Sequence, residues 1–218
     1  MNLEHIKPED IEKRSFEIIT DELRERGFQR DVSNEQLTVI KRCIHTTADF
    51  DYAETLCFSE GAVSTFQKLI REGATVVTDT NMALSGINKQ VLAQYGCDSV
   101  CFMADEDVAV SARQKGVTRA SVSMNRAMSI SGPVIFVIGN APTALITIRE
   151  CYDTGTYIPA FVVGVPVGFV NVVAAKELIT QSDIPYIVNR GRKGGSNVAA
   201  AIVNALLYDM RKTDQNRS

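Results

Sequence analysis

The residue whose type and setting best suit chemistry is His45, one of two histidines in the chain. Residues 46–51 follow it with two threonines and with Asp49 and Asp51, so hydroxyls and carboxylates lie close to an imidazole in sequence. One of the two aspartates could fix the tautomer of the ring. An imidazole ordinarily titrates near pH 6.5, which suits a group that donates and recovers a proton near neutrality. His5 lies in a polar N-terminal segment that offers nothing to hold it.

Three interpretations of His45 stay open on spacing alone. It could be a general acid, or it could simply be a favourable partner for a helix dipole, because a histidine near a helix C-terminus is common for that reason. It could also bind a metal together with Asp49 and Asp51, as in a metal-dependent hydrolase. The chain offers no second well-placed histidine, so zinc or iron is poorly supported and we predict no metal site.

Glycine-rich and polar segments form a second set of candidates, because each directly follows a predicted strand. Ligands of open parallel sheets bind beyond the carboxyl ends of the strands. Glycine allows close backbone approach to a ligand, and the helix N-termini that follow offer free N–H groups to anions. Arg190 and Arg192 could grip carboxylates with forked guanidinium groups. The segments span residues 78–81, 139–143, 164–168 and 189–196.

Together these four segments would form an anion-binding rim, to which there are two alternatives. Each segment, taken singly, could be an ordinary set of turn glycines and helix caps. A nucleotide site would need a Gly-x-x-x-x-Gly-Lys-Ser/Thr loop or a Gly-x-Gly-x-x-Gly fingerprint, and the sequence contains neither at these positions. A Gly-x-Ser-x-Gly nucleophile elbow is also absent. The number of such segments at one sheet edge weakens the first alternative, and the Arg-Lys-Gly-Gly-Ser run at residues 192–196 could bind either phosphate or carboxylate.

The elements that must position these residues can be read from the apolar spacing. Helices are predicted from Pro8 to Gly27, from Ser33 through His45 with Gln36 at capping-box spacing, and over residues 59–73. Short β-branched runs then alternate with helical stretches, which is typical of parallel βαβ units. This predicts a three-layer α/β/α fold with a doubly wound, mostly parallel five-stranded sheet. The predicted strands are residues 74–78, 99–103, 134–138, 160–165 and 186–188.

Composition bounds the class of protein. At 218 residues, with 45% hydrophobic and 22% charged residues, one globular domain over residues 1–218 is expected. A net charge of -3 argues against a nucleic-acid partner. The five cysteines form no Cys-x-x-Cys pair, which favours reduced thiols and a cytoplasmic location. The N-terminus has no apolar stretch typical of a signal peptide, and glycines and prolines interrupt the apolar segment 159–175, so no membrane span is expected.

The chain resembles a known family, the precorrin-8X methylmutases of corrin (vitamin B12) biosynthesis, over nearly its whole length. The order and spacing of seven motifs carry the resemblance. They are Arg14-Ser15-Phe16, Ile44-His45, Asp79 with Met82, Thr118-Arg119, Gly139-Asn140-Ala141-Pro142-Thr143-Ala144-Leu145, Gly164-x-Pro166-Val167-Gly168-Phe169-Val170, and Gly191-Arg192-x-Gly194-Gly195-Ser196.

The resemblance implies an isomerase that moves a methyl group from C-11 to C-12 of the corrin macrocycle without a cofactor. It also implies a flavodoxin-like fold and a homodimer. His45 would be the general acid that protonates the ring system. The resemblance and the rim together assign substrate binding to Ser15, Asp79, Arg119, Asn140, Thr143, Gly164, Gly168, Arg190, Arg192, Gly194, Gly195 and Ser196.

The acidic stretch after His45 resembles the anaerobic branch of the family, which inserts cobalt early, so cobalt-precorrin-8 is the favoured substrate. The exit of the last strand, Val188-Asn189-Arg190-Gly191, has one more residue than in some members, which leaves the role of Arg190 open. A non-catalytic corrinoid or tetrapyrrole carrier is the main alternative function, since it would keep the loops and arginines but would have no need for His45.

Overall fold

The computed structural model describes residues 3–215, so residues 1–2 and 216–218 of the predicted domain lie outside it. A short 3-10 turn, Pro8–Asp10, leads into the first helix. The α-helices of the described part are α1 (Ile11–Glu25), α2 (Asn34–Thr47), α3 (Tyr52–Thr55), α4 (Ala62–Arg71), α5 (Asn81–Gly86), α6 (Lys89–Gln94), α7 (Glu106–Lys115), α8 (Arg119–Ala127), α9 (Pro142–Asp153), α10 (Val172–Thr180) and α11 (Ser196–Gln215).

The sheet has six strands in the order β1-β6-β5-β4-β2-β3. The five predicted strands are all present and pair in parallel. Numbered among themselves they lie in the order 2-1-3-4-5, which is the order of flavodoxin-type doubly wound sheets. The strands are β1 (Leu56–Phe58), β2 (Thr75–Thr78), β3 (Ser99–Val100), β4 (Val134–Ile138), β5 (Phe161–Gly164) and β6 (Tyr186–Asn189).

The sixth strand corrects the prediction of a five-stranded sheet. β1 pairs antiparallel with β6, with Cys57 opposite Val188, and forms an edge of the sheet. It has three residues between two helices, which is too short to show a period-2 pattern. Its existence depends on pairing with a strand about 130 residues later in the chain, and local sequence carries no signal of that pairing.

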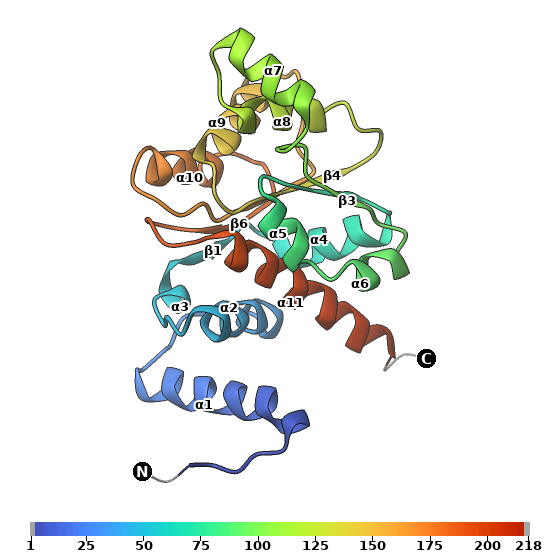
Figure 1. Cartoon of the computed structure of the whole chain (residues 1–218). Helices are drawn as coiled ribbons and strands as arrows, with labels where there is room; N and C mark the ends of the chain where they lie inside the picture. Colours follow the sequence, from blue (N-terminus) through green and yellow to red (C-terminus); the bar gives the residue numbers. More distant parts are fainter. Residues whose placement is uncertain (1–2, 216–218) are drawn as a thin grey trace.

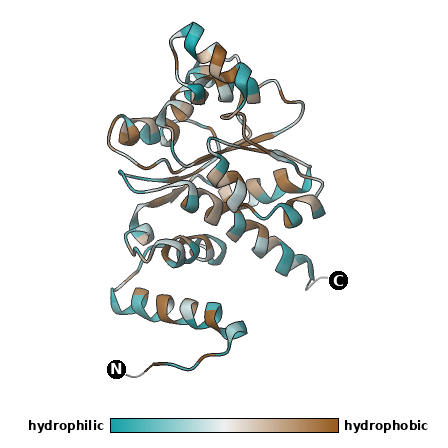
Figure 2. Cartoon of the chain, viewed as in Figure 1, coloured by the Kyte–Doolittle hydropathy of each residue, from teal (hydrophilic) through white to brown (hydrophobic). Residues whose placement is uncertain are grey.

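Helices cover both faces of the sheet, as the three-layer prediction requires (Figure 1). Alternate side chains of the central strands enter two separate cores, so that Val76 and Ile135 lie in one and Val77 and Phe136 in the other. α4, α5, α6 and α11 pack on the first face, and α8, α9 and α10 on the second. Figure 2 shows both hydrophobic and hydrophilic residues along the helices. No helix within residues 3–215 is long and apolar enough to span a membrane.

The N-terminal helices add layers beyond α11. α2 packs on α11 and α1 packs on α2 (Figure 1). The predicted capping box at the start of α2 is confirmed, because the Ser33 hydroxyl accepts from the Gln36 N–H and the Gln36 side chain accepts from the Ser33 N–H. α2 ends at Thr47, and its C-cap residue Ala48 has a left-handed φ of +54°. This boundary places His45 in the last turn of the helix, against the outer side of α11.

Candidate active site

His45 is held by an aromatic ring rather than by a hydrogen bond. Its imidazole stacks on Phe16 of α1, with ring centroids 5.3 Å apart and planes 15° apart. The Arg42 guanidinium, one turn earlier on α2, lies 4.7 Å from the centroid of the same Phe16 ring. Among residues 3–215, no group forms a hydrogen bond with the His45 ring, and the residue is exposed. Its two nitrogens are therefore available to a ligand.

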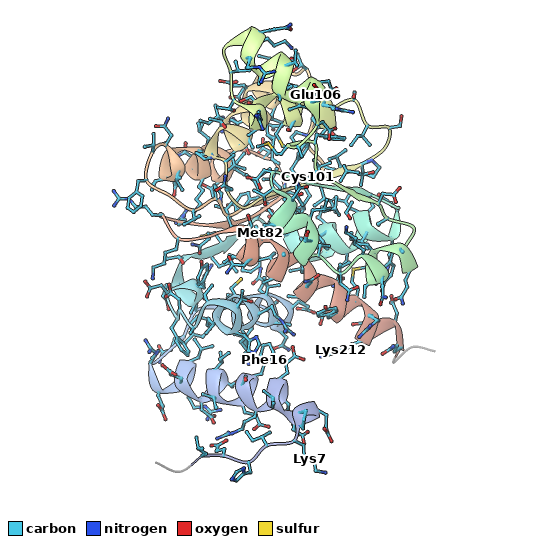
Figure 3. The ribbon with its side chains drawn as sticks, in the orientation of Figure 1. Lys7, Phe16, Met82, Cys101, Glu106 and Lys212 are labelled. Carbon is cyan, nitrogen blue, oxygen red and sulfur yellow. The ribbon has the colours of Figure 1, made fainter. Side chains whose placement is uncertain are left out.

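His45 borders an open cavity of about 610 Å³. Its floor is α11, and its walls come from α2 and from the α5–α6 segment. Figure 3 shows Phe16 beside α2 and Lys212 near the far end of α11. We call this cavity the His45 groove, and its lining residues are Glu12, Arg42, His45, Thr46, Gly86, Asn88, Asn197, Ala200, Ala201, Asn204, Tyr208, Arg211 and Lys212.

Cations outnumber anions in the His45 groove. Arg42, Arg211 and Lys212 line it, against a single carboxylate, that of Glu12. Glu12 forms an ion pair with Arg42, and the hydrogen bond from Arg42 holds the pKa of Glu12 below its ordinary value. The remaining two cations, Arg211 and Lys212, suit a ligand that carries carboxylates.

The wall opposite His45 is fixed by a set of amide hydrogen bonds that the sequence reasoning missed. Asn204 of α11 accepts from the Asn88 N–H at 2.9 Å and donates to the Gly86 carbonyl at 2.8 Å. A Cβ on Gly86 would lie 2.8 Å from the Ala200 Cβ, so only glycine lets α5 approach α11 this closely. The signal that could have revealed this wall is the presence of Asn197 and Asn204 within the otherwise apolar stretch 197–207 of this helix.

Asp79 lies beneath the predicted rim rather than on it. Its side chain is fully buried and accepts the backbone N–H groups of Gly139, Asn140 and Ala141 at 2.8, 2.8 and 2.6 Å. Burial raises the pKa of the Asp79 carboxyl, while the three N–H donors act in the opposite direction. The site is the point between β2 and β4 where the strand order reverses. The structure therefore places Asp79 where it holds this turn.

The loops that follow the strands meet at the N-terminus of α11. The Thr80 and Ser196 hydroxyls lie 2.8 Å apart, and a Cβ on Gly139 would lie 2.7 Å from the Ser196 Cα. This brings the loops after β2, β4 and β6 into contact, as the convergent rim requires. Asn197, the next residue of α11, already lines the His45 groove. Rim and groove are thus joined through the first turn of α11.

Two of the predicted rim glycines are needed for packing. Gly194 has a φ of +158°, and a Cβ there would lie only 2.1 Å from the Val165 carbonyl oxygen. Gly195 donates its N–H to that same oxygen at 2.9 Å. Gly164 is buried, and its missing side chain makes room for Val188 and Leu145. Gly194 and Gly164 therefore shape the rim from within.

The other predicted binding residues fall into separate positions. Arg119 is the exposed first residue of α8, and it adjoins α9 because the Thr118 hydroxyl donates to Thr143 at 2.9 Å. Asn140 is exposed above Asp79. Three of these residues lie beyond the carboxyl ends of the strands and do not line the His45 groove, namely Arg119, Asn140 and Thr143. The Ser15 hydroxyl donates to the Ile11 carbonyl of its own helix at 2.9 Å.

The loop after β6 carries the two predicted arginines. Arg190 pairs with Glu177 of α10 at 3.7 Å, and the Arg192 guanidinium lies 5.4 Å from the centroid of the exposed Phe169 ring. The Gly168 N–H donates to the Arg192 carbonyl at 3.1 Å. The loops after β5 and β6 are thus joined at this end of the rim.

Asp49 and Asp51 do not orient His45. Both accept from the Lys193 ammonium at 2.6 Å, which ties the turn after α2 to the loop after β6. Burial alone would raise the pKa of Asp49, but the hydrogen bonds from Lys193 and from the Asp51 N–H outweigh it and lower that pKa. Within the described residues no group of three His, Cys, Asp or Glu side chains is placed to hold a metal, so the hydrolase interpretation lacks its ligand cluster.

Comparisons with known proteins agree with this geometry. A family model described as precorrin-8X methylmutase matches residues 10–209. The cobalt-precorrin-8 methylmutase of Salmonella typhimurium is 46% identical, with 94% of this chain and 97% of the relative covered. The precorrin-8X methylmutase of Pseudomonas aeruginosa is 35% identical, with 90% and 93% covered.

A solved structure matches as well. The crystal structure of precorrin-8X methyl mutase from Thermus thermophilus superposes with a TM-score of 0.84 at 36% sequence identity, covering 94% of this chain and 97% of that one. The resemblance seen in the motifs thus extends to the fold over 94% of this chain. This chain belongs to the precorrin-8X methylmutase family.

Proposed function

We propose that this protein is an isomerase of corrin ring biosynthesis that moves a methyl group from C-11 to C-12 of a precorrin-8 macrocycle, with His45 as general acid. The observation that carries the assignment of the acid is the exposed His45 ring, stacked on Phe16 at the edge of a groove that contains cationic side chains. In this scheme His45 gives a proton to the ring system, the methyl group migrates, and His45 recovers the proton, so that substrate and product are isomers.

The composition of the groove supports a corrinoid acid as the ligand. Such a molecule has carboxylate side chains around an apolar ring, which calls for cations at the edges and for small or apolar side chains beneath the ring. Arg211 and Lys212 supply the cations that are not paired with Glu12, and Ala200 and Ala201 supply small side chains on the floor. A volume of about 610 Å³ falls within the range of small-molecule sites. Holding the macrocycle in one geometry would contribute the remaining rate enhancement.

The favoured substrate is cobalt-precorrin-8. The chain is 46% identical to a relative named for that substrate and 35% identical to one named for precorrin-8X. The acidic stretch with Asp49 and Asp51 supports the same branch, and the structure adds a reason for its acidity, since both carboxylates bind Lys193.

We also infer that the reaction needs no cofactor, and that the protein acts in the cytoplasm as a homodimer. The methyl shift is intramolecular, so no external methyl donor enters its balance. Phe169 and Val170 are 81% and 77% exposed on one loop, and an exposed apolar patch of this kind supports a partner surface. Light scattering on the purified protein measures its mass directly, and a mass of one chain would refute the dimer.

The decisive experiment compares His45→Ala with His5→Ala, a matched control at the other histidine of the chain. With cobalt-precorrin-8 as substrate and the visible spectrum as readout, we expect His45→Ala to lose about 10² to 10⁴ in kcat while still binding. His5→Ala should keep the wild-type rate. A wild-type rate in His45→Ala would refute the mechanism. Tight binding without conversion by the unmodified protein would instead identify a carrier.

Metal analysis of the purified protein tests the hydrolase alternative independently. That alternative requires metal in stoichiometric amount, bound through His45, Asp49 and Asp51. We expect Asp49→Asn to leave the metal content unchanged, because its carboxylate is bound to Lys193. A stoichiometric metal that this substitution removes would revive the alternative.

A further inference from the structure

Lys176 of α10 is a buried cation that the proposed reaction does not use. It is 0% exposed, and its ammonium donates to the backbone carbonyls of Gly191 and Lys193, both at 2.8 Å. No carboxylate within residues 3–215 forms an ion pair with it. Burial lowers the pKa of Lys176 to about 8. A buried charge without a counter-ion is costly, and an apolar side chain would avoid that cost.

The two carbonyls belong to the loop after β6, residues 190–195, which carries Arg190, Arg192 and the glycines of the rim. Asn189, also buried, donates its side-chain N–H to the Lys193 carbonyl at 2.9 Å. The Gly191 and Lys193 carbonyls are therefore turned inward onto two buried donors. Such an arrangement leaves the side chains of Arg190 and Arg192 on the outer surface, where both are exposed.

The charge of Lys176 also matters to this loop. Carbonyl dipoles that point at an ammonium no longer present their negative ends to a ligand, and the ammonium adds positive charge directly beneath the rim. Both effects favour an anion on the outer side, and they act across a buried, low-dielectric region in which screening is weak. A buried group that costs folding free energy in this way is expected at a functional site rather than elsewhere in a fold.

We propose that Lys176 is a positioning residue for substrate binding, which fixes the loop 190–195 so that it can receive carboxylates of the corrinoid. This inference rests on the proposed function and adds a residue to it. Lys176 does not contact the ligand itself, because it is fully buried. Its effect passes through the Gly191 and Lys193 carbonyls.

The other charged groups around this loop are paired outward. Arg190 faces Glu177, the neighbour of Lys176 on α10, and Lys193 extends to Asp49 and Asp51. Arg192 lies over an aromatic ring. Lys176 is thus the charged group on the inner side of the loop, and burial is the cause that shifts its pKa.

The test uses Lys176→Met, which keeps the length of the side chain but removes its charge and its donors. The ligand is cobyrinate, the reaction product, with binding followed by the visible spectrum, and turnover is measured with cobalt-precorrin-8. We expect Kd and KM to rise at least tenfold while kcat stays within about twofold. The matched control is Ile179→Val, also fully buried on α10, which should lower stability without changing Kd.

The pH dependence of binding by the unmodified protein provides a second test that needs no substitution. We expect the Kd for cobyrinate to rise as the pH passes from 7 to 9.5, because Lys176 loses its proton in this range, and this rise should be absent in Lys176→Met. If Lys176→Met fails to fold, the wild-type profile decides alone, and a flat profile overturns the inference. A folded Lys176→Met that binds within twofold of wild type also overturns it. If the unmodified protein neither binds cobyrinate nor converts the substrate, the proposed function itself has failed.

Discussion

Replacement of Asp79 by Asn tests whether a buried carboxylate holds the turn after β4. The carboxylate accepts three N–H groups, from Gly139 on one oxygen and from Asn140 and Ala141 on the other. Asn offers a single acceptor oxygen, so one N–H loses its partner and faces an amide NH₂, and the other two bonds lose their charge assistance. Hydrogen bonds to charged groups contribute about 1.5 to 3 kcal/mol and neutral ones about 0.5 to 1.5.

These values give an expected loss of about 2 to 4 kcal/mol in the free energy of unfolding, because removal of the buried charge offsets part of the lost hydrogen bonding. For a chain of this size the loss corresponds to a fall in Tm of roughly 4 to 16 °C. Equilibrium unfolding in urea and a thermal scan measure it.

The matched control for Asp79→Asn is Asp183→Asn, an exposed carboxylate for which we expect a change below about 0.5 kcal/mol. A loss below about 1 kcal/mol in Asp79→Asn would refute the reasoning. If stability were unchanged and the Kd for cobyrinate rose, Asp79 would have to contact the ligand directly, which is the role first expected from the sequence.

Two further predictions concern the rim. Gly194→Ala places a Cβ 2.1 Å from the Val165 carbonyl oxygen, so we expect a loss of about 3 kcal/mol or more in urea unfolding. Gly155→Ala, whose left-handed glycine has open space around it, should lose only about 1 kcal/mol, and equal losses would contradict the steric argument. Lys193→Met should change stability at pH 7 by less than about 1 kcal/mol, because the ion pairs are exposed. The lowered pKa of Asp49 contributes stability above pH 4 that is lost as the pH falls through the folded-state pKa. Lowering the pH should therefore destabilise the unmodified protein more than it destabilises Lys193→Met. Identical losses of stability in acid would contradict the ion pair between Lys193 and Asp49.

Much of the architecture could be predicted because its signals are local. The capping box at Ser33 and Gln36 and the apolar spacing after it define α2, and buried β-branched runs define the parallel strands. β1 could not be predicted in the same way, since its three residues become a strand only by pairing with β6. β3 was predicted to extend to residue 103 but ends at Val100, because only its first residues find partners on β2.

The sequence by itself determined which residues are available for chemistry: a single well-placed histidine, glycines after three of the five predicted strands, arginines near residue 190, and the motifs that define the family. Only the tertiary structure decided what each one does. Asp49 and Asp51 are near His45 in sequence, yet they bind Lys193 from a loop more than 140 residues away, while His45 stacks on Phe16 from another helix. Asp79 and Lys176 give no local signal of being buried. The physical reason is that burial and partner choice depend on long-range packing, which short-range periodicity and spacing do not encode.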